Sequence, residues 1–246
     1  MKACGIVAEY NPFHKGHAYQ IKKIKEESDA DVIIAVMSGN FLQRGEPAIV
    51  DKWTRAKMAL NSGVDLIIEL PVHWSVQPAD LFAKGSIRLL SEVEIDYLSF
   101  GTEDGEASDF YEAARFLNRN EKKISGRIAK DSRMNMSYAE KMERIIFELN
   151  PEFPLDLASP NAQLGLSYQR ELFDLDLENS VKLLPIKRLG PSYREKKIHH
   201  HPFIASATAI RETVFAGEDY TPYLDSSTIE IFKNKLNEKV SWDSFF

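Results

Sequence analysis

The segment that decides the start of the fold reads Cys4-Gly5-Ile6-Val7-Ala8-Glu9-Tyr10-Asn11-Pro12-Phe13-His14-Lys15-Gly16-His17. An apolar run leads into a turn that contains Pro12. The turn opens onto Ala18–Glu26, where Ile21 and Ile24 recur at helical spacing. The pattern predicts a first β-strand, a tight connection and a first helix.

Two histidines and a glycine stand where this first helix begins. A helix N-terminus presents unpaired N–H groups and a partial positive charge, so it suits a phosphate group. His14 and His17 are three residues apart, which places them on one face of the first turn. Gly16 has no side chain, so a ligand can approach its backbone closely. We therefore predict a nucleotide triphosphate site here; the alternative is a pair of surface histidines that cap a turn.

Composition limits the class of protein. The 246 residues, of which 43% are hydrophobic, can form one large α/β domain or one domain with an appendage. The net charge of −6 argues against nucleic-acid binding by overall charge but leaves room for a local basic patch. Cys4 is the single cysteine, which predicts no disulfide framework and a cytoplasmic location. No apolar run reaches about 18 residues, so no membrane span is expected.

Strand and helix patterns alternate through the first hundred residues. Val32–Met37 is a continuous apolar run typical of a strand buried on both faces. Further strands are predicted at 64–71 and 95–100, and further helices at 51–60, capped by Asp51, and at 78–90. This alternation predicts a Rossmann-like, doubly wound parallel sheet, with polar loops 38–48 and 101–105 at the strand ends where ligands bind.

The pattern changes after Glu106. Residues 107–150 carry many charges and predict a helical insertion with helices at 107–118, 122–131 and 137–149. Ser159 as N-cap and Pro160 at the first position predict a helix that runs to Phe173. Residues 181–186 predict a fifth strand, and Pro185 favours a place at the sheet edge.

The last part of the chain holds a second helix start with anion-binding residue types. Ser206 and Thr208 are N-cap residues, and Arg211 lies one turn from Thr208 on the same face, where a guanidinium fork suits phosphate oxygens. The alternative is an ordinary cap with a surface arginine. The three adjacent histidines 199–201, in the polar loop 190–202, suggest a metal site, but their spacing does not converge on one point in a helix or strand. We therefore favour a solvated loop, with the metal site as the alternative.

We predict three regions: residues 1–106 and 151–216 as an ATP-binding domain, residues 107–150 as the helical insertion, and residues 217–246, with a helix near 227–238, as the start of a C-terminal helical region. Trp242, Phe245 and Phe246 at the end are expected to meet apolar partners, either in another chain or in a further C-terminal portion.

The combination of motifs resembles a known group. His14-x-Gly16-His17, together with Ser206-x-Thr208-x-Ile210-Arg211, resembles the HxGH nucleotidyltransferase superfamily, which shares its fold and first motif with class I aminoacyl-tRNA synthetases. Longer strings across the whole chain resemble the bacterial tRNA(Met) cytidine acetate ligase family. These strings are residues 5–17, 37–48, 51–60, 65–71, 98–104, 159–166, 187–190 and 205–211.

The resemblance implies a reaction and a set of contacts. ATP and acetate would give acetyl-adenylate and pyrophosphate, and the acetyl group would pass to the wobble cytidine of elongator tRNA(Met) to form acetylcytidine. His14 and His17 would be catalytic, and Mg²⁺ would travel on the triphosphate. The ATP contacts implied are Val7, Ala8, Glu9, Tyr10, Asn11, Pro12, Phe13, His14, Lys15, Gly16, His17, Ala18, Tyr19, Gln20, Gly101, Asn161 and Arg188; Ser206, Thr208 and Arg211 join them from the second helix start.

Two departures from the family pattern stand out. Ala207 occupies a place where many nucleotidyltransferases carry a second serine, so one phosphate contact is expected to be absent. Family members are also generally longer than this chain, and the remaining part is expected to help hold tRNA.

Several roles stay open at this point. Some of Arg44, Lys52 and Arg55 are expected to face RNA or substrate, although a solvated helix face explains Lys52 and Arg55 equally well. Neither Glu9 nor Asp104 is singled out as the group that takes the cytidine proton. The competing functions are a nucleotidyltransferase that adenylylates a small phosphorylated cofactor precursor and a non-catalytic nucleotide- or RNA-binding module.

Overall fold

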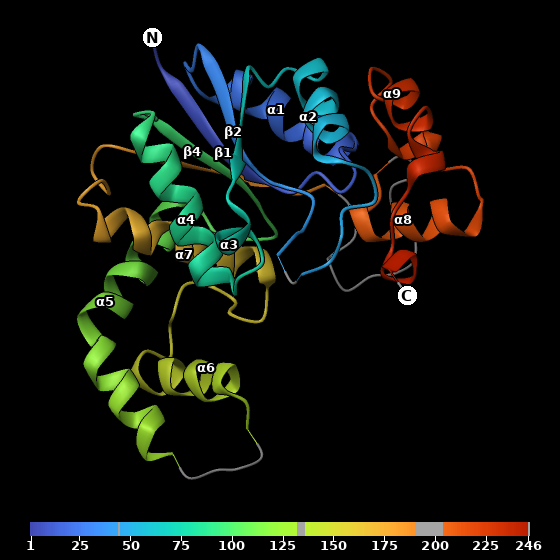
Figure 1. The fold of residues 1–246 in the computed structure, drawn as a ribbon. Helices are drawn as coiled ribbons and strands as arrows, with labels where there is room; N and C mark the ends of the chain where they lie inside the picture. The colour runs from blue at the N-terminus through green and yellow to red at the C-terminus, as the bar shows by residue number, and fades with distance from the viewer. Residues whose placement is uncertain (44, 132–135, 190–203, 246) are drawn as a thin grey trace.

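The structure is a computed structural model that describes residues 1–43, 45–131, 136–189 and 204–245. Its centre is a five-stranded sheet in the order β3-β2-β1-β4-β5, and every neighbouring pair is parallel (Figure 1). The predicted α/β sheet is confirmed. The strands are β1 (Ala3–Ala8), β2 (Val32–Ser38), β3 (Leu66–Leu70), β4 (Tyr97–Thr102) and β5 (Lys182–Lys187).

Helices cover both faces of this sheet, as a doubly wound fold requires. The core divides into two clusters: one lies under α1, α2 and α8, and the other lies under α4, α5 and α7. The longer helices are α1 (Lys15–Glu27), α2 (Lys52–Asn61), α4 (Ala79–Glu92), α5 (Ala107–Lys130), α6 (Tyr138–Leu149), α7 (Pro160–Asp174) and α8 (Ala207–Ala216); the short ones are α3 (Val72–Ser75), α9 (Ile229–Lys233) and the 3₁₀ turns at Thr221–Tyr223, Leu236–Glu238 and Trp242–Phe245.

The strands confirm the positions that their sequences favour. β2 is buried along almost its whole length, as its unbroken apolar run requires. β5 lies at one edge of the sheet, where Pro185 leaves no ladder hydrogen bond unmade. The central strand β1 sends Cys4, Ile6 and Ala8 into the α1 side of the core.

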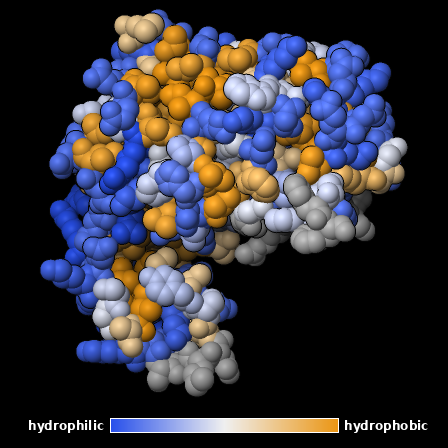
Figure 2. All heavy atoms as spheres, in the orientation of Figure 1, coloured by the Kyte–Doolittle hydropathy of each residue, from blue (hydrophilic) through white to orange (hydrophobic). Residues whose placement is uncertain are grey.

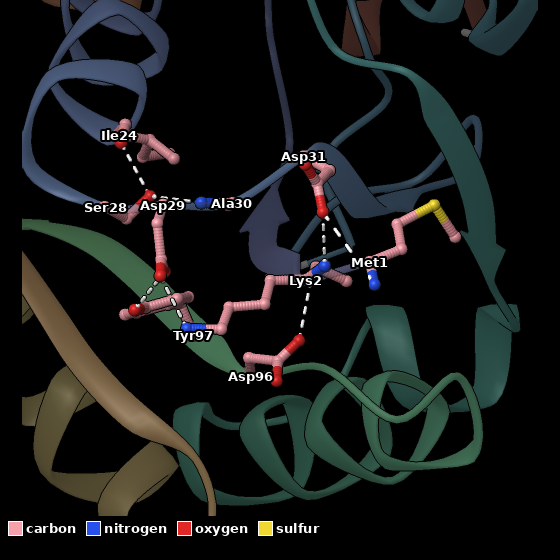
Figure 3. Close-up of polar contacts among 10 residues, drawn as sticks. Met1, Lys2, Ile24, Ser28, Asp29, Ala30, Asp31, Asp96 and Tyr97 are labelled. Carbon is pink, nitrogen blue, oxygen red and sulfur yellow. Dashed lines mark hydrogen bonds and ion pairs between the residues drawn. The ribbon is translucent and has the colours of Figure 1, made fainter.

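Polar contacts close the amino ends of the strands, opposite the edge where ligands bind in such sheets (Figure 3). The Ala3 N–H donates to Asp96 Oδ2 at 2.8 Å, and the Lys2 N–H donates to Asp31 Oδ2 at 2.7 Å. Asp29 accepts from both Lys2 Nζ and the Tyr97 hydroxyl at 2.5 Å. The contacts of Asp29 and Asp31 are exposed, so each contributes little stability, whereas the Ala3–Asp96 contact is partly buried. Together they align β1 with its neighbours.

Two helix predictions were wrong in their bounds. Residues 107–130 form one continuous helix, α5, and not two. No helix-breaking residue separates the halves, and Leu117 and Ile124 continue one buried face. The Asn120 side-chain amide also donates to the Phe116 carbonyl one turn earlier. Near the C-terminus, α9 ends at Lys233 because the Lys235 N–H turns back to the Phe232 carbonyl, three residues away, and a separate 3₁₀ turn follows.

The helices α5 and α6 form an arm that projects from the body of the molecule (Figure 1). Its root lies between β4 and α7. The apolar side of α5, which includes Phe110, Leu117 and Ile124, packs toward α6 and α7. In the described part of the chain, no helix combines the length and the apolar character needed to cross a bilayer.

Candidate active site

A cavity of about 430 Å³ opens at the carboxyl ends of the strands. Its walls come from the ends of β1, β4 and β5, the starts of α1, α7 and α8, and the loop that follows β2. The structure thus brings together residues from one end of the chain to the other. The predicted residues in the lining are Val7, Ala8, Glu9, Tyr10, Asn11, His14, Gly16, His17, Tyr19, Gln20, Gly101, Asn161, Arg188, Ser206, Thr208 and Arg211.

Four predicted contacts lie outside the lining: Pro12, Phe13, Lys15 and Ala18. Phe13 is fully buried in the core beneath the turn, and Ala18 packs against the same cluster. Lys15 Nζ donates to the Pro222 carbonyl at 2.6 Å, which ties α1 to the C-terminal segment. These residues shape the corner from behind, and their direct contact with ATP stays a prediction.

The start of α1 is held by its two histidines. His14 is the N-cap residue, and its Nδ1 accepts from the Gly16 N–H at 3.0 Å. His17 Nδ1 accepts from the His14 N–H at 3.2 Å, which completes a reciprocal capping box. The two rings stack with centroids 3.8 Å apart, and the Tyr10 ring meets His17 edge-on.

Both imidazoles are neutral at pH 7. Burial, with a smaller effect of the Arg188 charge, lowers the pKa of His14 to about 3. Burial and the neighbouring charges of His14 and Arg188 lower the pKa of His17 well below its ordinary value. Because each Nδ1 accepts a hydrogen bond, the single proton of each neutral ring belongs on Nε2. The corner therefore holds two fixed N–H donors in a poorly solvated place.

Gly16 is required by the packing of this corner. A Cβ at residue 16 would lie 2.7 Å from His14 Cε1 and 3.0 Å from His14 Nδ1. Any side chain there would push the imidazole out of its cap. Close approach of a ligand to the Gly16 backbone stays a prediction, in addition to this structural reason for glycine.

The start of α8 forms the facing wall. Ser206 caps the helix through a hydrogen bond from the Ala209 N–H to Oγ at 3.2 Å, as predicted, whereas Thr208 lies within the first turn. Arg211 donates from Nη1 to the Asn11 carbonyl at 2.8 Å and from Nη2 to Thr208 Oγ1 at 3.3 Å. The guanidinium thus joins α8 to the turn before α1.

Sequence reasoning missed Glu103, which organises the third wall. Its carboxylate accepts from the Ser159 hydroxyl at 2.6 Å and from the Asn161 amide, and Arg188 Nε lies 4.0 Å away. The Arg188 side chain also lies over Gly101, where a Cβ would come within 3.3 Å of its Cγ. The only signal in the sequence was the polar loop expected after β4.

The loop after β2 contributes Leu42, Gln43 and Glu46 to the lining. Glu9 Oε1 accepts from the Gln43 N–H at 2.8 Å, which joins this loop to the end of β1. Burial raises the pKa of Glu9, against the opposing effects of that hydrogen bond and of the Arg211 and Arg55 charges. Arg44 lies outside the described residues, so its predicted contact with RNA or substrate stays a prediction.

The expectation for Arg55 was wrong. Its side chain is fully buried and faces neither solvent nor ligand. The guanidinium donates to the carbonyls of Glu9, Ser38 and Gly39, at the ends of β1 and β2, and to the carbonyl of Val50, just before α2. It thus provides partners for buried backbone carbonyls. Arg55 therefore holds the ends of β1 and β2 in place from beneath the cavity.

Two other candidates, Lys52 and Asp104, fall outside the cavity. Lys52 forms an ion pair with Glu69, with Nζ and Oε2 2.6 Å apart, on the outside of the sheet. Asp104 does not line the cavity. The histidines 199–201 lie outside the described residues. Within the residues that the structure does describe, no group of three or more potential metal ligands gathers.

The sequence matches a protein family and several relatives of known name. The model of the HIGH Nucleotidyl Transferase family matches residues 1–246. The chain is 42% identical over 251 residues to the tRNA(Met) cytidine acetate ligase of Listeria monocytogenes serovar 1/2a, and 40% identical over 255 residues to the protein of the same name from Lysinibacillus sphaericus. All of this chain is matched in both cases, and it spans 63% and 62% of the length of these relatives.

Solved structures show the same relationship. The apo structure of Thermotoga maritima TmcAL superposes on 97% of this chain with a TM-score of 0.87 and 30% identity. The same protein bound with alpha-thio ATP gives a TM-score of 0.85 and 32% identity, again over 97% of this chain. The matched parts are 57% and 56% of those chains.

Proposed function

This chain belongs to the HIGH nucleotidyl transferase family, and we propose that within it the protein is an ATP-dependent tRNA(Met) cytidine acetate ligase. It activates acetate as acetyl-adenylate and transfers the acetyl group to the wobble cytidine of elongator tRNA(Met). The observation that carries this proposal is the cavity at the carboxyl ends of the strands, where two neutral histidines meet two arginines. The curated relatives bear this activity in their names, and the similar Thermotoga protein binds an ATP analogue.

The first step needs positioning more than covalent help. An acetate oxygen attacks the α-phosphorus, the bond to the β-phosphate oxygen breaks, and pyrophosphate leaves. The Nε2–H groups of His14 and His17 donate to phosphate oxygens as charge moves toward the leaving group. Neutral donors serve this task because they are already fixed by the capping box and need no proton transfer.

The cations act on the pyrophosphate side. Arg211 with Thr208 comes from α8, and Arg188 with Asn161 comes from the end of β5 and the start of α7; each pair is anchored to a neighbouring element. Mg²⁺ would come with the triphosphate and would supply positive charge that screens it. Val7–Gln20, Gly101, Asn161 and Arg188 remain the proposed ATP contacts.

The second step moves the acetyl group. The cytidine amine attacks the acetyl carbonyl, the bond to the adenylate oxygen breaks, AMP leaves, and the amine loses a proton. Glu9 lines the cavity and Asp104 does not, so position favours Glu9 as the acceptor of that proton. Its raised pKa suits a group that takes up a proton during turnover.

The test is an assay of both half-reactions with the purified protein. We expect pyrophosphate exchange into ATP that depends on acetate, and acetylcytidine in tRNA(Met) when the RNA is added. Exchange that ignores acetate but requires a phosphorylated small molecule would replace this proposal with the cofactor-precursor reaction. ATP binding without any turnover would leave a binding module.

The domain division follows the sequence pattern and the arm formed by α5 and α6. We propose that residues 1–106 and 151–216 form the ATP-binding domain, that 107–150 are an insertion in it, and that 217–246 begin a C-terminal helical region. The cytoplasm is the proposed location, because tRNA and ATP are both found there.

A further inference from the structure

The outer side of the arm carries a row of cations that the adenylation chemistry does not use. From residue 115 to residue 130, α5 contains six lysines and arginines and one carboxylate. Five of the cations follow the spacing i, i+4, i+7, i+8 and i+15, which places them on one face of a helix. We call this set the basic face: Arg115, Arg119, Lys122, Lys123 and Lys130.

The basic face points away from the protein core. Phe110, Leu117 and Ile124, which α5 buries against its neighbours, lie on the opposite side of the helix. Figure 2 shows hydrophilic residues along the outer edge of the arm and hydrophobic ones between its two helices. The helix rise of 1.5 Å per residue spreads the five cations over about 22 Å.

Carboxylates lie beside only one end of this face, where Asp109, Glu112 and Glu152 line the same hollow as Arg115 and Arg119. Arg115 pairs with Glu112 at 3.0 Å, but the other four cations have no ion pair within the described residues. Glu121 is turned toward α7, where its Oε1 lies 3.6 Å from Arg170 Nη2. Arg119, Lys122, Lys123 and Lys130 are exposed. A local cationic row on a chain of net charge −6 indicates a polyanionic partner.

The arm is attached to the cavity at both of its ends. It leaves the sheet just after Gly101, at the end of β4, and returns to Pro160 and Asn161, at the start of α7, and all three residues line the cavity. Along α5, the basic face begins about 12 Å from the first residue of the helix and ends about 35 Å from it. A ligand that fills the cavity and extends along the arm must therefore be a macromolecule.

We propose that the basic face binds the phosphate backbone of the RNA acceptor. This rests on the proposed function, since it assumes that the acceptor is a nucleic acid. Lysines and arginines that contact phosphates hold an RNA in position without reading its bases. Such contacts release counterions, so five of them would make the logarithm of the binding constant fall with the logarithm of salt concentration with a slope of about −3.5 to −4.5.

The experiment compares two triple variants of the 246-residue chain with the same change in charge. R119Q/K122Q/K123Q removes the centre of the basic face. The control, K22Q/K25Q/K57Q, removes three exposed lysines from α1 and α2. Binding of a tRNA(Met) transcript is measured from 50 to 200 mM salt, and circular dichroism checks the fold of each variant.

We expect the basic-face variant to bind at least about tenfold more weakly at 50 mM salt, with a salt slope reduced by about 2 to 3, and the control to bind like the wild type. Wild-type affinity in the basic-face variant, an equal loss in the control, or no tRNA binding by the wild-type chain would each overturn the proposal. Acetate-dependent pyrophosphate exchange, measured without RNA, should be unchanged in both variants. Its absence from the wild type would defeat the proposed function, and the tRNA-binding comparison would still decide the role of the basic face.

Discussion

Two helices, α1 and α8, begin at the same cavity. Both starts are capped by a side chain, but the groups that they present to the cavity differ in charge. Each has a side-chain cap that accepts a backbone N–H: His14 Nδ1 in α1 at 3.0 Å and Ser206 Oγ in α8 at 3.2 Å. The α1 cap is a buried, neutral ring that is 6% exposed. The α8 start instead places a permanent cation, Arg211, beside its cap.

The difference shows how one cavity combines neutral N–H donors, held in place at α1, with the positive charge of Arg211 at α8. Burial removes the charge of an imidazole but leaves its N–H, and a guanidinium stays protonated in any such place. The hydrogen bond from Arg211 to the Asn11 carbonyl joins the two helix starts, although they are 200 residues apart in the chain. We interpret the α1 start as the source of precise donors and the α8 start as the source of charge.

The most severe test of this comparison is His14→Ala. We expect the rate of acetate-dependent pyrophosphate exchange to fall at least about a hundredfold, because a fixed transition-state donor is lost. His73→Ala, on the exposed face of α3, is the matched control and should keep the wild-type rate. A near-wild-type rate in His14→Ala would show that this residue has no part in the mechanism and serves only as the N-cap of α1.

The next largest effect is expected in the pH dependence of stability, because the start of α1 contains a titrating imidazole at its cap and the start of α8 does not. The pKa of His14 is about 3 in the folded protein and about 6.5 in an unfolded chain. Between these values only the unfolded chain takes up the proton, so this group lowers the free energy of unfolding as the pH falls below 6.5. At pH 5 the loss should be about 2 kcal/mol relative to pH 7.

Urea unfolding at both pH values measures this effect, with His14→Gln as the variant that lacks the titrating group. The decline between pH 7 and pH 5 should be shallower in His14→Gln by about the same 2 kcal/mol. Equal declines in wild type and variant would mean that folding does not shift the pKa of His14 and that burial does not hold its ring neutral.

Gly16→Ala tests whether the α1 donors depend on their position. The added Cβ would lie 2.7 Å from His14 Cε1, so the ring must leave its cap, and we expect pyrophosphate exchange to fall about tenfold. Gly126→Ala in α5 is the control, because a Cβ there meets nothing within 4 Å, and alanine should stabilise the helix by up to about 1 kcal/mol. Full activity in Gly16→Ala would show that the position of the ring is unimportant.

The smallest effect is expected at the α8 cap. Ser206→Ala removes the acceptor for the Ala209 N–H and should lower the free energy of unfolding by about 1 kcal/mol. Ser206→Thr keeps a capping hydroxyl and should restore most of this loss. Thermal or urea unfolding of the two variants measures the difference. If Ser206→Ala is as stable as the wild type, the Ser206 cap contributes nothing to the free energy of unfolding. The starts of α1 and α8 would then differ in their dependence on a side-chain cap.

Local patterns predicted much of the fold and the first half of the site. The apolar run of β2, the caps at Asp51 and Ser159, and the edge position of Pro185 all appear as expected. The capping histidines could be placed because their partners lie within three residues. By contrast, the break expected within α5 was wrong, since the buried face continues through residues that look polar in a short window.

The sequence alone therefore determined the five strands, most of the helices and the apolar face of each, because these depend on neighbours along the chain. The prediction that the starts of α1 and α8 suit a phosphate rests on the same local spacing. Only the tertiary structure decided that Arg55 is buried beneath the cavity, that Glu103 joins Asn161 to Arg188, and that Arg211 reaches Asn11. Burial and charge pairing depend on groups brought close by the parallel sheet, and no spacing in the chain encodes which distant groups those are.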